Sequence, residues 1–269
     1  MLGACTIHGQ DYFNETYDSE KIKHLVIDNF QGDIIVQRSN TEKISVIAVQ
    51  EGQNKKQTLT LKKYMQEELV YLYIDHPCRQ DFGAFDPDHP FKYSRSWNDC
   101  EWNNDENAFP TLSFTIQIPD GVDIYVATVM DSKIEIERVK GNIYASNVNG
   151  PISMTGVQSV KNGTTVNGDI NIYYDVNPDI SGFFSTINGE INLNVPKDAS
   201  ITTKFKSQMG EMFTDLDAIQ IMDKKQASGI IKAGENFKIE EYSHAKIGQG
   251  EITMTIETFN GNAYLRKNK

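Results

Sequence analysis

The sequence has no long apolar run, no concentration of positive charge and few cysteines. Every apolar run falls short of the roughly 18 residues that a membrane helix needs, so no transmembrane helix is predicted. Lysine and arginine number 26 against 37 aspartates and glutamates, which gives a formal net charge of −11. An acidic surface repels phosphate backbones, so nucleic acid is not an expected partner.

Motifs of the common enzyme and cofactor sites are also missing. The sequence holds no HExxH, no GxSxG, no GxGxxG and no Walker A loop. The chain is therefore predicted not to be an enzyme, and we assign it no catalytic residue, no cofactor and no metal ligand. Asp86, Asp88 and His89 could ligate a metal, but they lack a fourth partner and make a weak case.

The three cysteines, Cys5, Cys78 and Cys100, include no CxxC pair. This spacing argues against a zinc ribbon and a thioredoxin-type site. Cys78 and Cys100 bracket one polar segment, and a disulfide between them would add about 3 kcal/mol on the chain-entropy model. Such a bond implies an oxidising compartment. The alternative is two unpaired thiols in a reducing cytosol, and the sequence leaves both open.

The chain begins MLGAC, and LGAC resembles a lipobox, the bacterial signal after which the cysteine is lipidated. Cys5 is therefore a candidate lipidation site and a candidate membrane tether. The charged and apolar regions of a signal peptide do not precede it. Either the start is truncated or the match is chance, and another interpretation places an export cleavage near residues 8–10.

Short β-strand patterns follow a polar segment. Residues 1–20 are predicted to be a flexible N-terminal lead-in, after which β-branched and aromatic residues alternate with polar ones. Long helical periodicity is largely absent, so the predicted fold class is all-β. Strands are predicted at residues 24–28, 32–36, 43–49, 57–61 and 69–74, the last two as a hairpin.

Residues 75–110 interrupt the strand patterns with both tryptophans and four prolines. We predict a long aromatic loop insertion here. Exposed rings would give a flat apolar binding surface, with nearby aspartate and asparagine side chains as hydrogen-bonding groups. The alternative is that these rings pack against the rest of the fold and cover it. The candidate ligand-binding residues are Phe91, Tyr93, Trp97 and Trp102.

From residue 111 the sequence becomes repetitive. Residues 165–172 read TVNGDINI and residues 186–193 read TINGEINL. Four turn glycines between Gly150 and Gly210 are 18, 21 and 21 residues apart, and a near-fixed period indicates a stacked repeat fold. Asn-Gly permits a sharp turn, and Ile-x-Ile puts two apolar side chains on one face. We predict a parallel β-helix-like solenoid, with an antiparallel sandwich or meander as the alternative.

One β-repeat domain is predicted over residues 21–269, with repeats at 111–213, a lateral excursion at 214–247 and a C-terminal cap at 248–269. An acidic residue often follows the turn glycine. In stacked rungs these carboxylates would line one edge about 5 Å apart, either solvated or bridged by a cation such as calcium. The acidic positions are Asp33, Asp169, Glu190, Glu211 and Glu251.

Four features of the sequence together carry a family resemblance. They are LVIDNFQGDI at residues 25–34, the serial Asn-Gly-[Asp/Glu]-Ile turns, FTIQIPDGV at residues 114–122 and TFNGN at residues 258–262. These motifs resemble the bacterial "putative adhesin" proteins of the cell envelope, whose main domain has no known function. The likeness covers residues 22–266 and implies export to the envelope, a β-solenoid-like shape and no catalytic residues to transfer.

The resemblance favours a binding or adhesion module of the envelope, in the periplasm or at the outer surface. Its partner would be an unknown protein or glycan of the envelope or the host. A structural envelope scaffold and a polysaccharide-active enzyme are the alternatives, because fold alone does not fix function. The enzyme alternative requires a groove with two convergent carboxyl groups.

Overall fold

The computed structural model describes residues 11–51, 60–75, 85–91, 110–216, 219–222 and 242–268. These residues form strands, turns and loops, and none of them is helical. A helix long and apolar enough to cross a membrane is accordingly not found in these ranges. The all-β prediction is confirmed for this part of the chain.

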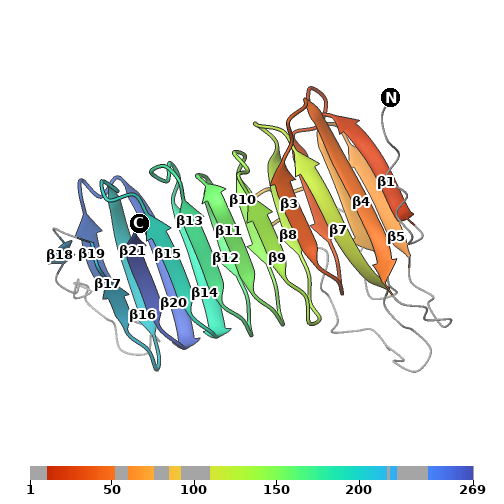
Figure 1. Cartoon of the computed structure of the whole chain (residues 1–269). Coiled ribbons are helices and arrows are strands. Elements are labelled where there is room, and N and C mark those ends of the chain that lie inside the picture. The colour runs from red at the N-terminus through yellow and green to blue at the C-terminus, as the bar shows by residue number, and fades with distance from the viewer. Residues whose placement is uncertain are drawn as a thin grey trace, which may run out of the picture.

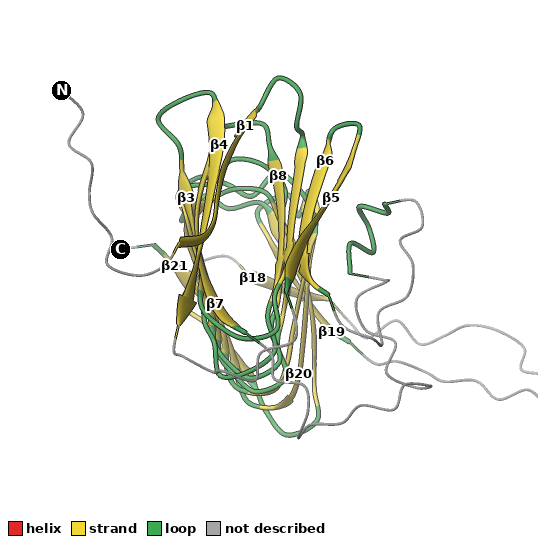
Figure 2. Ribbon diagram, turned by 90° about the vertical axis from the view of Figure 1, so that its right-hand side faces the viewer, coloured by secondary structure: helices red, strands yellow, loops and turns green. Residues whose placement is uncertain are grey.

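The strands form two sheets that lie face to face (Figure 1, Figure 2). In spatial order, sheet A consists of β1 (Asp11–Asp18), β4 (Lys43–Glu51), β7 (Thr111–Ile118), β3 (Ile34–Arg38), β9 (Ile134–Glu137), β11 (Ile152–Val157), β13 (Ile170–Tyr174), β15 (Ile191–Val195), β21 (Ala263–Lys267) and β17 (Met212–Thr214). Sheet B consists of β18 (Ile219–Met222), β19 (Ser243–Ile247), β16 (Ile201–Ser207), β20 (Ile252–Asn260), β14 (Gly182–Asn188), β12 (Val160–Thr164), β10 (Ile143–Ser146), β8 (Asp123–Ala127), β2 (His24–Asp28), β6 (Leu69–Ile74) and β5 (Leu61–Gln66).

The chain alternates between the two sheets, and a strand of sheet B with the next strand of sheet A forms one rung. The rungs β8–β9, β10–β11, β12–β13 and β14–β15 follow one another, and their strands pair in parallel in both sheets. Antiparallel pairs occur only towards the two ends of the stack among the described strands. The arrangement is thus two mostly parallel sheets in a solenoid-like stack, and not the antiparallel alternative.

The register of the strands explains the period of the sequence. Ile134, Ile152, Ile170 and Ile191 lie side by side across sheet A and are fully buried between the sheets. Removing each from water contributes about 1.5–3 kcal/mol. The alternate residues of each strand point to solvent. A repeat of 18 to 21 residues is therefore one circuit through both sheets.

The C-terminal rung, β20–β21, does not cap the stack. β20 pairs in parallel with β14 on one side and β16 on the other, and β21 lies between β15 and β17. The predicted cap at residues 248–269 is therefore wrong. The turn at residues 258–262 has the same Asn-Gly form as the repeat turns, so this rung stacks on both of its neighbours.

Three other sequence predictions differ from the structure. Residues 11–18 form β1 instead of a flexible lead-in, because Phe13 and Tyr17 alternate with polar residues and pack on the core. The hairpin strand predicted at residues 57–61 lies at Leu61–Gln66. The excursion at residues 214–247 contributes β18 and β19 to sheet B, where β19 pairs with β16.

The turns that lead from sheet B to sheet A stack closely on one another. The amide of Asn167 donates to Oδ1 of Asn149 at 2.8 Å, and Asn260 donates to Asn188 at 3.5 Å. The backbones also approach each other, since a Cβ added to Gly168 would lie 2.2 Å from the carbonyl oxygen of Gly150. Glycine recurs in these turns because a side chain would collide with the turn of the neighbouring rung.

Candidate functional site

Sheet B carries an aromatic cluster on its outer face, which points away from sheet A. Tyr71 on β6, Val26 on β2, Tyr125 on β8 and Tyr144 on β10 are in register across neighbouring strands. The rings of Tyr125 and Tyr144 stack with their centroids 4.7 Å apart. All four side chains are buried although they lie on the outside of the stack. Another part of the chain must therefore cover them.

Residues 85–91, which belong to the segment between β6 and β7, provide this cover (Figure 2). Phe85 and Phe91 pack against the cluster. The ring of Phe85 meets Tyr125 edge to face, with centroids 5.3 Å apart. The aromatic residues of this short segment thus bury part of the outer face of sheet B.

A local hydrogen-bond network shapes the covering segment. The carboxylate of Asp86 lies 3.0 Å from Nδ1 of His89 and accepts the backbone N–H of Asp88 at 3.0 Å. The hydrogen bond with His89, followed by that from Asp88, holds the pKa of Asp86 below its usual value. The resulting turn places the Asp88 and His89 side chains at the boundary between the covering segment and the next part of sheet B.

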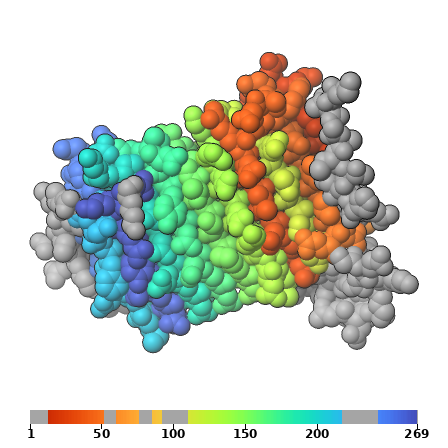
Figure 3. Space-filling view, viewed as in Figure 1, coloured from red at the N-terminus to blue at the C-terminus, as the bar shows by residue number. Residues whose placement is uncertain are grey.

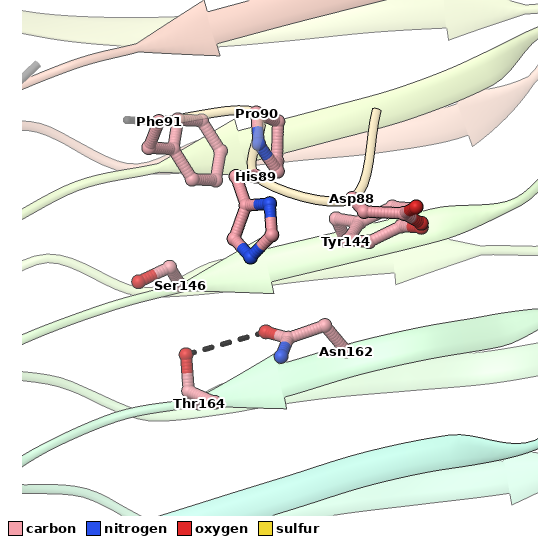
Figure 4. Close-up of a pocket in the computed structure, with 8 residues that line it drawn as sticks. All are labelled: Asp88, His89, Pro90, Phe91, Tyr144, Ser146, Asn162 and Thr164. Carbon is pink, nitrogen blue, oxygen red and sulfur yellow. Dashed lines mark hydrogen bonds between the residues drawn. The ribbon is translucent and has the colours of Figure 1, made fainter. Parts of the chain in front are cut away.

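A hollow of about 300 Å³ lies at this boundary, and we name it the loop groove (Figure 4). Its wall consists of Asp88, His89, Pro90 and Phe91. Its floor consists of Tyr144 and Ser146 on β10 and of Asn162 and Thr164 on β12. Figure 4 shows the imidazole of His89 pointing into the hollow toward Ser146 and Asn162. Aromatic, hydroxyl, amide and imidazole groups therefore converge on one space.

The floor of the loop groove offers neutral hydrogen-bonding groups. Burial raises the pKa of Tyr144 to about 12, and the nearby carboxylate of Asp88 adds to the shift. Tyr144 is therefore a protonated phenol at neutral pH. The hydroxyl of Thr164 donates to Oδ1 of Asn162 at 3.3 Å. Among the described residues the amide nitrogen of Asn162 has no partner, so its two N–H groups can serve a ligand.

A second, smaller hollow of about 240 Å³ lies at the other end of the covering segment. His24, Phe85 and the β5–β6 turn at residues 66–69 line it. Nδ1 of His24 lies 3.6 Å from a carboxylate oxygen of Asp123. Because His24 already packs against Phe85 and Tyr125, we assign the larger hollow and not this one as the candidate site.

The structure describes one of the four ligand-binding residues predicted from the sequence. Phe91 lines the loop groove. The others lie outside the described residues, as do all the cysteines, so the aromatic surface, the disulfide and the lipidation stay predictions. The residues in question are Tyr93, Trp97, Trp102, Cys5, Cys78 and Cys100.

Sequence reasoning missed the floor of the groove. Tyr144 and Ser146 stand two apart on one strand, and Asn162 and Thr164 stand two apart on the next. This period-two spacing places each pair on one face of its strand. It could have identified polar positions on the outer face, but the register that joins the two pairs comes only from the structure.

The acidic residues that follow the turn glycines join neighbouring rungs. Oδ1 of Asp33 accepts the backbone N–H of Lys133 at 3.0 Å, and Oδ1 of Asp169 accepts that of Glu190 at 2.8 Å. Glu251 does not belong to this row, because it precedes β20 whereas the stacked turns follow the strands of sheet B. Within the described ranges, no three His, Cys, Asp or Glu side chains gather closely enough to hold a metal ion.

Comparison with known proteins gives likeness at the level of structure alone. No protein-family model matches the chain, and no curated protein matches it. A "putative cell adhesion protein" from Clostridium sporogenes has 14% identity and a TM-score of 0.40, with 95% of this chain and 99% of that chain covered. A "putative adhesin" from Bacteroides fragilis has 10% identity and a TM-score of 0.35, with 94% and 96% covered. A "putative lipid binding protein" from Parabacteroides distasonis has 10% identity and a TM-score of 0.25, with 97% and 98% covered. Solved bacterial structures described as adhesins or cell adhesion proteins, the group that the sequence motifs resemble, thus match this chain over nearly its full length.

Proposed function

We propose that this chain is a non-catalytic binding or adhesion module of the bacterial cell envelope, and that its ligand occupies the loop groove. The observation that carries the proposal is the convergence of Phe91, Tyr144, Ser146, Asn162 and Thr164 on one hollow. Aromatic rings supply apolar contact area, and hydroxyl and amide groups fix the orientation of a ligand.

The groups that line the groove favour binding over hydrolysis of a glycosidic bond. Hydrolysis usually requires two carboxyl groups about 5–10 Å apart around the substrate. The described lining supplies one carboxylate, Asp88, because Asp86 is engaged by His89 and does not line the hollow. A structural scaffold of the envelope is the alternative, and it would not require the groove at all.

The binding proposal is tested with a panel of polysaccharides and purified peptidoglycan, scored for retention of the protein and for release of reducing ends. Ser146→Trp places a large side chain in the groove floor and is expected to reduce retention on the bound member of the panel at least tenfold. Ser185→Trp is the matched control, because Ser146, Thr164 and Ser185 are in register on three neighbouring strands and Ser185 does not line the groove.

Three results would contradict the proposal. Equal loss of retention in Ser146→Trp and Ser185→Trp would mean that the ligand does not bind in the loop groove. Release of reducing ends by the wild type, abolished in Ser146→Trp, would favour the enzyme alternative. Retention of none of the panel, together with self-association, would favour the scaffold.

We also propose an envelope location, in the periplasm or at the outer surface, with Cys5 as the candidate site of a lipid tether. Brief protease treatment of intact cells tests this, with a known periplasmic protein as the control. Loss of the chain while the control survives places it on the outer surface. If the chain resists the protease until the cells are lysed, a location on the outer surface is excluded.

A further inference from the structure

The outer face of sheet A, opposite the loop groove, holds a strip of neutral polar side chains in an acidic protein. In register across β11, β13 and β15 lie Ser153, Asn171 and Asn192, and this row continues to Tyr264 on β21. Figure 3 is viewed onto this face, with β21 in dark blue. The strip crosses parallel strands, so it suits a ligand that lies across them.

Arg266 at one side of the strip is held in place, and among the described residues it has no acidic partner. Its guanidinium carbon lies 4.3 Å from the centroid of the Tyr264 ring. On the neighbouring strand, Phe213 stacks on the same ring with centroids 5.3 Å apart and an interplanar angle of 19°. These contacts restrict the guanidinium before any ligand arrives.

The two other arginines among the described residues are paired. Arg38 contacts Asp120 at 2.5 Å, and Arg138 lies 3.8 Å from Glu137. Over the same ranges no carboxylate lies within ion-pair distance of Arg266. A restricted, unpaired guanidinium presents a planar set of N–H donors that fits a carboxylate in a bidentate manner.

The strip also presents two side-chain amides and one exposed aromatic ring that could contact a ligand. In the described part of the chain, the side-chain amides of Asn171 and Asn192 have no hydrogen bond, unlike the turn asparagines. Tyr173 is 48% exposed. Tyr173 pairs with Asn194, which pairs with Arg266, so the backbones of Tyr173 and Arg266 lie two strands apart, or about 10 Å.

We infer that this face of sheet A, comprising Asn171, Tyr173, Asn192 and Arg266, is a binding site for a carboxylate-bearing sugar chain. The carboxylate of a uronic-type residue binds the guanidinium of Arg266. The C–H face of a neighbouring pyranose ring packs on Tyr173, and the amides of Asn171 and Asn192 bind hydroxyl groups between them. This site is separate from the loop groove and does not rest on the function proposed for it.

Negative charge from two sources could oppose an anionic ligand, one beside the site and one spread over the whole protein. Glu190 accepts a hydrogen bond from the hydroxyl of Tyr264 at 3.3 Å, at the far end of the ring from its backbone. The net charge of −11 acts at longer range, where salt screens it over about 8 Å at physiological ionic strength. Contact with Arg266 is much shorter than that distance, so the local attraction persists.

The test measures binding of a galacturonic acid oligosaccharide by calorimetry at 150 mM salt, with a galactose oligosaccharide of the same length as the neutral comparison. The wild type is expected to bind the acidic chain more tightly than the neutral one. Arg266→Ala is expected to weaken binding of the acidic oligosaccharide at least tenfold. It should change binding of the neutral oligosaccharide little. Arg138→Ala, which removes another exposed arginine, directly after β9 of the same sheet, is the matched control.

Tyr173→Ala is expected to weaken binding of both oligosaccharides. Tyr173→Phe is expected to bind both as well as the wild type does, because the ring and not the hydroxyl makes the contact. Arg266→Lys keeps the charge but not the planar fork, and is expected to bind the acidic chain about as weakly as Arg266→Ala. Circular dichroism and thermal unfolding of each variant show that it is folded.

The proposal is overturned if the folded wild type does not bind the acidic oligosaccharide. It is also overturned if Arg138→Ala weakens binding of that oligosaccharide as much as Arg266→Ala does. Binding of inorganic phosphate through Arg266, without binding of the acidic oligosaccharide, would also overturn it and indicate a phosphate site. Ser146→Trp in the loop groove is expected to leave this binding unchanged, so the two sites fail or succeed separately.

Discussion

The side-chain amide of Asn188 donates a hydrogen bond to Oδ1 of Asn167, 2.7 Å away in the turn of the preceding rung. The side-chain amide of Asn167 likewise donates a hydrogen bond to Oδ1 of Asn149 in the turn before it. Side chains at the same position of successive turns therefore bind one another directly. The Asn-Gly motif of the sequence thus has two separate roles, since the asparagine links the rungs and the glycine lets them approach.

Replacing Asn167 is expected to destabilise the stack, because this residue is both donor and acceptor in the ladder. Loss of two hydrogen bonds in Asn167→Ala should lower the free energy of unfolding by about 1–2 kcal/mol. Urea denaturation measures the change. Asn260→Ala is the control, because it removes one longer bond of 3.5 Å and should cost less. Equal stability of Asn167→Ala and the wild type would show that the ladder contributes nothing.

The turn glycines are expected to be more sensitive than the asparagines. In Gly168→Ala the new Cβ would lie 2.2 Å from the carbonyl oxygen of Gly150, so the rungs must separate, and we expect a loss of about 4 kcal/mol or failure to fold. Gly121→Ala separates this collision from backbone strain. Gly121 has a φ of +78° and nothing within 4 Å of an added Cβ, so its replacement should cost only about 1–2 kcal/mol. Similar losses in the two variants, measured by urea denaturation, would contradict the close approach of the turns.

The repeats could be predicted from the sequence because each one contains its own turn and its own apolar pair. TVNGDINI and TINGEINL specify a turn and the inward positions of a strand without reference to the rest of the chain. The spatial order of the rungs could not be predicted in this way. Any rung with an Asn-Gly turn can stack on any other, so nothing local places TFNGN at residues 258–262 between the turns of β14–β15 and β16–β17.

The candidate site was predictable only in part, for the same reason. Phe91 belongs to a segment whose aromatic content identifies it in the sequence. Asn162 and Thr164 look like ordinary outward residues of a repeat strand. They become part of a groove because residues 85–91 pack beside them, and that contact spans more than 70 positions of the sequence.

A disulfide between Cys78 and Cys100 stays a prediction, since both lie outside the described residues. If it forms, alkylation of the exported protein under denaturing, non-reducing conditions should leave these two cysteines unmodified in a peptide mass map. Cys100→Ser should then lower the thermal stability of the oxidised protein and make it insensitive to reductant at this site. Alkylation of both thiols without reduction would contradict the bond.

Stability should decrease at alkaline pH through Tyr144 in the floor of the loop groove. Burial, with a smaller effect of Asp88, raises the pKa of Tyr144 from 10.0 to about 12. The neutral phenol is therefore favoured in the folded chain, while the unfolded chain ionises near pH 10. The stabilisation is present in full below pH 10 and is lost as the pH rises toward 12.

Urea unfolding at intervals between pH 8 and pH 12 tests this expectation. The free energy of unfolding of the wild type should fall more steeply above pH 10 than that of Tyr144→Phe, which has no phenol at this position. The variant should still lose some stability in this range, because burial also raises the pKa of its neighbour Tyr125. Parallel curves for the two proteins would mean that Tyr144 ionises in the folded state as easily as in the unfolded state. The groove floor would then be open to water beside the phenol, and the covering segment at residues 85–91 would not shield it.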